Sequence, residues 1–143
     1  MYGSNPSPFA PRALPSSLYA RVGLETEIHT ASAHRLVTLL FDGVYESMAQ
    51  ARGAIQTRNT MLKNRSITRA VRILDEGLKA ALNLEAGQLA TDLRDLYAWL
   101  CMRLTYANLH SDAAAIEQCE RILAPVREAW TAIAAQADVP RAA

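Results

Sequence analysis

The sequence predicts an all-α fold, an antiparallel up-down four-helix bundle preceded by a mobile, Pro-rich N-terminal segment. Half of its 143 residues are hydrophobic but only 6% are aromatic, and the abundant Ala and Leu favour helices over sheets. Apolar residues recur every three or four positions in four long stretches. The connections between these stretches are short, which makes consecutive helices antiparallel neighbours.

The chain length fits a single domain with a flexible segment at each end. Residues 1–17 contain four of the six prolines and little apolar area, so we expect a mobile tail. Residues 18–138 should form the bundle, and residues 139–143 a flexible C-terminus. Leu18, Tyr19 and Val22 form an apolar cluster too short to build a core, so we expect this segment to lie across the bundle.

The first predicted helix begins at Ser32, whose hydroxyl can cap it, and ends near residue 57. Two adjacent apolar rows give this helix a wide apolar face, so more than one neighbour should cover it. Gly43 lies in its middle at a cost of roughly 1 kcal/mol relative to Ala. A close backbone approach at Gly43 would explain that cost.

The other predicted helices span about residues 66–83, 88–109 and 112–136. The polar residues 58–65 fit either a loop or a frayed helix. Gly87 supplies a residue that tolerates positive φ before the third helix, and Ser111 or Asp112 caps the fourth. These short connections support the up-down order of the bundle.

The third predicted helix has a second apolar face. Its core row is Leu89, Leu93, Leu96, Tyr97, Leu100, Leu104 and Ala107. Trp99, Met102 and Tyr106 recur at i, i+3 and i+7, well off that row. Because a bundle helix needs only one apolar row, these three residues indicate extra core contact, self-association or a partner-binding groove.

The charge distribution is uneven although the formal net charge is only +1. Residues 52–79 carry seven basic and two acidic side chains, whereas residues 85–120 carry six acidic and two basic ones. Attraction between antiparallel neighbours explains this asymmetry. Arg65, Arg69 and Arg72 form a stripe that could touch phosphates, but it lacks aromatic side chains on which bases could stack. A solvated helix face is therefore favoured over a nucleic-acid site.

The sequence predicts a protein that is not an enzyme and holds neither a cofactor nor a metal. Cys101 and Cys119 lie within or beside apolar rows, where packing is favoured over catalysis. His29 and His34 are five residues apart, not the four that align ligands on one helix face. The sequence contains neither a phosphate-binding glycine loop nor a hydrolase motif. We expect a cytoplasmic protein that does not insert into membranes.

Residues 30–43, TASAHRLVTLLFDG, resemble the T-A-S-P-x-x-L-apolar-x-x-L-[FY]-[DE]-G signature of the flagellin-specific export chaperones, the FliS family. Ala33 stands where that family usually has Pro. Further matches follow in the family's order: Tyr19-Ala-Arg-Val22, Ala51-Arg52, Leu96-Tyr97, Arg103-Leu104, Ala107-Asn108 and Ala129-Trp130. This ordered set covers residues 19–130.

The resemblance implies a cytoplasmic export chaperone that binds the disordered C-terminal segment of flagellin. It implies that the chaperone prevents premature polymerisation and delivers flagellin for flagellar type III secretion, with export-gate components as further candidate partners. The candidate flagellin-binding residues are Leu18, Tyr19, Val22, Trp99, Met102 and Tyr106. The alternative is a structural or regulatory bundle that self-associates through Trp99, Met102 and Tyr106, or one that touches nucleic acid through its arginine stripe. The sequence leaves open whether the protein is a monomer or a dimer.

Overall fold

The computed structural model describes residues 33–138, with side chains up to residue 135. The predictions for residues 1–32 and 139–143 lie outside the described residues. They include the tail, the cap at Ser32 and the cluster of Leu18, Tyr19 and Val22.

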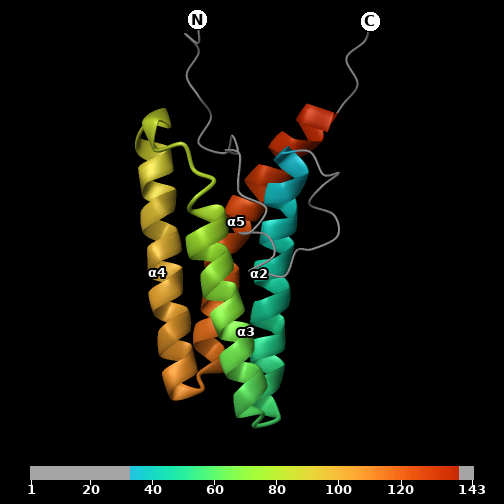
Figure 1. Ribbon diagram of the computed structural model, residues 1–143, viewed down its shortest axis with the longest axis vertical. Coiled ribbons are helices and arrows are strands. Elements are labelled where there is room, and N and C mark those ends of the chain that lie inside the picture. The colour runs from blue at the N-terminus through green and yellow to red at the C-terminus, as the bar shows by residue number, and fades with distance from the viewer. Residues whose placement is uncertain (1–32, 139–143) are drawn as a thin grey trace, which may run out of the picture.

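Four long helices and two short helical turns make up the described chain (Figure 1). They are α2 (Ala33–Gln56), α3 (Thr60–Arg72), the π-helical turn η1 (Ile73–Leu78), the 3-10 turn η2 (Leu84–Ala86), α4 (Gln88–His110) and α5 (Ala113–Asp138). Helices α2 and α4 each pack on both α3 and α5. The predicted all-α bundle is confirmed for this part of the chain.

The core lies along the bundle axis, and α2 supplies much of it. Leu40, Phe41, Val44 and Met48 on α2 are almost completely buried. The indole of Trp130 on α5 is also buried, and its Nε1 donates a hydrogen bond to Thr38 Oγ1 at 3.0 Å. Burying a large apolar side chain stabilises the fold by roughly 1.5–3 kcal/mol. The two apolar rows of α2 therefore join it to α3 and α5, as expected.

Two glycines allow α2 to approach the following helix closely. A Cβ atom at Gly43 would lie 3.0 Å from Ile73 Cδ1, so a side chain, rather than the backbone that was expected, packs closely on this glycine. A Cβ atom at Gly77 would lie 2.9 Å from Leu40 Cδ2. Gly77 belongs to η1, where the chain widens into a π turn.

The helix ends follow local hydrogen-bonding signals. The Asn59 side chain accepts a backbone N–H three residues on, so α3 begins at residue 60 and residues 60–65 are helical. Gly87 has the expected positive φ, 111°. Asp112 Oδ1 accepts the N–H of Ala115 at 3.2 Å and caps α5.

Two sequence-based assignments were wrong. Leu89 was placed in the core row of α4, but it lies in the first turn and is 51% exposed because the end of the bundle leaves it uncovered. Arg69 is half-buried and donates a hydrogen bond from Nη1 to Ser47 Oγ on α2 at 3.0 Å. It therefore packs between helices, while Arg65 and Arg72 are exposed.

One ion pair joins the basic and acidic stretches noted above. Arg52 on α2 pairs with Glu120 on α5, with 2.6 Å between Nε and Oε1. The pair is partly buried, and the same guanidinium donates from Nη2 to Oε2 at 3.1 Å. This charge-assisted contact helps to fix α2 against α5.

Candidate functional site

The outward side of α4 carries large apolar side chains that the bundle does not cover. Trp99 is 37% exposed, Met102 69%, Tyr106 43% and Leu109 80%. We call these four residues the outer stripe. Their spacing of three, four and three residues places them on one side of the helix. Leu93, Tyr97, Leu100 and Leu104 are buried on the opposite side.

The structure brings together three of the candidate residues, Trp99, Met102 and Tyr106. They are surface residues, so the interpretation as extra core contact is not favoured. Leu109 is a fourth member that the sequence reasoning missed, although its i+3 spacing from Tyr106 continues the row. The other candidates, Leu18, Tyr19 and Val22, lie outside the described residues.

Polar contacts hold Tyr106 in place within the outer stripe. The Arg103 guanidinium lies over the Tyr106 ring, 4.7 Å from its centroid, and Arg103 Nε donates to Gln118 Oε1 on α5 at 2.7 Å. On the other side, the rings of Tyr106 and His110 have centroids 4.3 Å apart. Because these contacts already order the side chains, a partner would lose less conformational entropy on binding.

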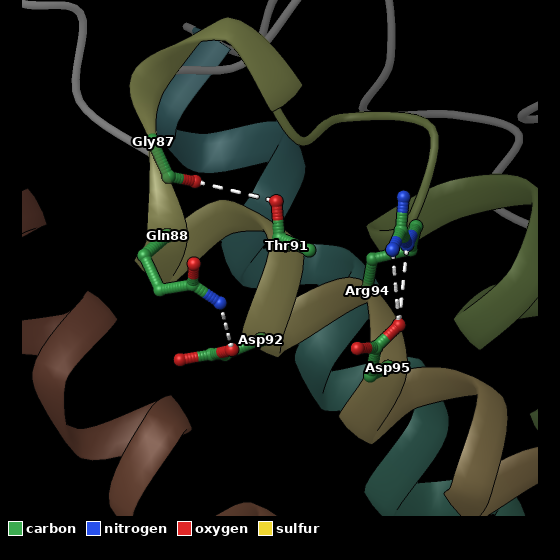
Figure 2. A network of polar contacts seen from close by, with 6 residues as sticks. All are labelled: Gly87, Gln88, Thr91, Asp92, Arg94 and Asp95. Carbon is green, nitrogen blue, oxygen red and sulfur yellow. Dashed lines mark hydrogen bonds and ion pairs between the residues drawn. The ribbon is translucent and has the colours of Figure 1, made fainter.

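The same side of α4 becomes acidic toward its N-terminus. Asp92 and Asp95 continue the alternating spacing that leads to Trp99. Gln88 Nε2 donates to Asp92 Oδ1 at 2.8 Å, and Arg94 Nη2 donates to Asp95 Oδ1 at 3.2 Å. Figure 2 shows both contacts. The outer face of α4 therefore has an acidic half and an apolar half.

Two shallow apolar hollows lie between neighbouring helices. The one between α3 and α4 has a volume of about 360 Å³ and is lined by Ile67, Thr68, Val71, Arg72, Thr105 and Asn108. The one between α2 and α5 has a volume of about 660 Å³ and is lined by Tyr45, Ala124, Arg127, Glu128, Thr131, Ala132 and Ala135. In the latter, the Arg127 guanidinium lies 4.5 Å from the Tyr45 ring centroid.

The described residues show no constellation for nucleophilic or metal-assisted chemistry. Burial raises the pKa of both Cys101 and Cys119 to about 11, so each stays a protonated thiol at neutral pH. Within residues 33–138, no group of three or more His, Cys, Asp and Glu side chains could hold a metal ion. In the same part of the chain, every helix is too short or too polar to cross a membrane.

Comparison with known proteins gives a consistent set of relatives. The family described as flagellar protein FliS matches residues 15–137. The flagellar secretion chaperone FliS of Salmonella typhimurium is 39% identical over 120 residues, which cover 83% of this chain and 89% of the relative. The flagellar secretion chaperone FliS of Escherichia coli is 35% identical over 113 residues, 78% and 83% of the two chains. The flagellar secretion chaperone FliSB of Pseudomonas aeruginosa is 35% identical over 116 residues, 80% and 91% of the two chains.

Proposed function

The chain belongs to the FliS family of flagellar secretion chaperones, and from this premise we propose that it binds the disordered C-terminal segment of flagellin in the cytoplasm. Binding keeps flagellin from polymerising before export and presents it for flagellar type III secretion. Components of the export gate are the second class of partner, because they receive the chaperone with its client.

The outer stripe is the observation that carries this proposal. Exposed aromatic and long aliphatic side chains gathered in one place are typical of partner-binding surfaces. Their three-and-four spacing matches the apolar face of an amphipathic helix, so a disordered segment can fold as a helix along α4. Covering each of these side chains is worth up to roughly 1.5–3 kcal/mol, which offsets part of the cost of ordering the client.

The N-terminal residues Leu18, Tyr19 and Val22 belong to the proposed site through the family resemblance alone. We assign them a role in covering the client surface until flagellin displaces them. Removing residues 1–22 should then change the affinity for flagellin. Unchanged affinity would remove these three residues from the site.

Self-association through the outer stripe is the rival interpretation, and charge disfavours it. If two α4 helices paired in parallel, Asp92 and Asp95 of each copy would face their counterparts. If they paired antiparallel about the centre of the stripe, the Arg103 side chains of the two copies would meet near the symmetry axis. Like charges that face each other oppose both arrangements. A client of different sequence avoids this repulsion.

Calorimetric titration with the last ~40 residues of flagellin tests the proposal, since a helix of that length spans roughly 60 Å, enough to follow a bundle helix and turn onto another. Met102→Glu should weaken binding by about tenfold or more, because it replaces an apolar contact with a charge that binding would bury. Met61→Glu is the matched control, since Met61 is 77% exposed on α3, outside the outer stripe. If the unaltered chain ignores the peptide, the function is wrong. If both variants bind equally well, the site is wrong.

A further inference from the structure

The turn from α2 to α3 and the turn from α4 to α5 lie at the same end of the bundle (Figure 1). A hollow of about 330 Å³ lies between these turns. Its lining residues are Ala54, Ile55, Arg58, Asn59, Thr60, Lys63 and Ser111. The lining thus combines two cationic side chains with hydroxyl groups, and it contains no carboxylate. This composition is the reverse of the outer stripe, so the proposed client surface does not explain it.

Lys63 is the unusual member of this lining because only 9% of it is exposed. Its ammonium donates to the carbonyl oxygen of Asn108 at 2.9 Å and to Ser111 Oγ at 2.8 Å. An ammonium group has three hydrogens, so one remains for another acceptor. Within residues 33–138, Lys63 forms no ion pair with a carboxylate.

A buried charge without a counter-ion is costly, typically by several kcal/mol. The carbonyl of Asn108 lies in the last turn of α4, where the helix dipole is negative, and this compensates Lys63 in part. The compensation amounts to about half a unit charge spread over the helix end. The hollow therefore keeps a positive charge that an anion would neutralise.

Arg58 adds a second cation to the same hollow. It is exposed and lies at the α2–α3 turn with a φ of 57°, a conformation that is uncommon outside glycine. The hydroxyl of Ser111 accepts a hydrogen bond from Lys63, which leaves its own hydrogen to donate. The hydroxyl of Thr60 also lines the hollow.

From this donor-rich lining we propose that the hollow binds an oxyanion, namely a phosphate or carboxylate group. Lys63 supplies the buried charge, Arg58 closes over the anion from the solvent side, and Ser111 donates a hydrogen bond. Charge-assisted hydrogen bonds of this type are roughly twice as strong as neutral ones, and two cations can supply them here. The volume of the hollow admits a group of phosphate size together with water.

Titration of the full chain with sodium phosphate, followed by amide NMR at constant ionic strength against sodium chloride, tests the proposal. Saturable shifts should concentrate at residues 58–63 and at Ser111. Arg58→Gln should raise the apparent Kd by about tenfold, because it removes one charge-assisted contact. Arg65→Gln is the matched control: Arg65 is exposed on α3 nearby but does not line the hollow, so the Kd should stay unchanged.

A second titration with sodium acetate identifies the preferred group, and saturable binding of either anion at these residues supports the site. The test uses Arg58→Gln and not Lys63→Met, because Lys63→Met would remove hydrogen bonds that join α3 to α4. That loss would perturb the fold itself. The proposal is overturned if neither anion gives saturable shifts there. Equal weakening by Arg58→Gln and Arg65→Gln would also overturn it, because it would show that the anions only screen surface charge.

Discussion

Gly77→Ala should destabilise the bundle, because the added methyl group meets a neighbour that cannot move away. The new Cβ would lie 2.9 Å from Leu40 Cδ2 and 3.3 Å from Leu40 Cδ1. Leu40 is completely buried, so it cannot swing into solvent to make room. Overpacking of this kind costs ~1–3 kcal/mol, and the better helix propensity of Ala offsets about 1 kcal/mol. We expect a net loss of about 1 kcal/mol in the free energy of unfolding.

Gly53→Ala on α2 is the matched control, because nothing lies within 4 Å of a Cβ at that position. Helix propensity acts alone there, so this variant should gain up to about 1 kcal/mol. Urea unfolding should therefore separate the two variants by about 2 kcal/mol with unchanged m-values. In a Leu40→Ala background, the Gly77→Ala penalty should disappear. Equal stability of the two Gly→Ala variants, or a penalty that persists beside Ala at position 40, would refute the close approach.

Three further predictions concern caps, hydrogen bonds and thiols. Asn59→Ala removes the N-cap of α3 and should lower the free energy of urea unfolding by about 1 kcal/mol; no change would mean that the cap contributes nothing. Tyr45→Phe removes the hydrogen bond from the phenol to the Glu120 carbonyl, 2.7 Å long, and should cost about 0.5–1.5 kcal/mol in the same assay. Burial raises the pKa of Cys101 and Cys119 to about 11, whereas unfolded thiols ionise near pH 8.5. The unfolded chain then loses these protons first, so stability is complete below about pH 8.5 and falls as pH rises toward 11. At pH 8, a thiol reagent should label the native chain on the order of 100-fold more slowly than the unfolded chain, and equal rates would contradict the burial.

The periodicity of apolar residues predicts the fold well, because every long helix buries a row at the helical repeat. The periodicity predicts less well which part of each helix its neighbours cover. Leu89 belongs to the core side of α4 by its spacing, but a row does not show where neighbouring helices end. The sequence does not fix the start of α3 for a related reason. The apolar row begins only at Ile67, whereas the cap that starts the helix is Asn59, eight residues earlier.

The sequence predicts only part of the candidate site. Trp99, Met102 and Tyr106 stand out in the sequence because they are large, apolar and off the core row. Leu109 is more exposed than these three residues and continues their spacing, but it lies in the last turn of the helix, so the spacing alone does not separate it from the connection that follows. The buried position of Lys63 could not be predicted. It depends on a contact between α3 and the end of α4, whose residues Lys63 and Asn108 are 45 positions apart in the chain.

The bundle divides stability and partner contact between different helices. On α2 the apolar rows face α3 and α5, and its outward positions, such as Asp42, Glu46 and Gln50, are polar. On α4 the buried row satisfies the core, so the outer stripe is not needed for folding. Removing an exposed apolar side chain costs little stability, since the side chain is already in water in the folded state. Met102→Glu should therefore change binding while leaving the midpoint of unfolding nearly unchanged, and that separation distinguishes a partner-binding surface from a misassigned piece of core.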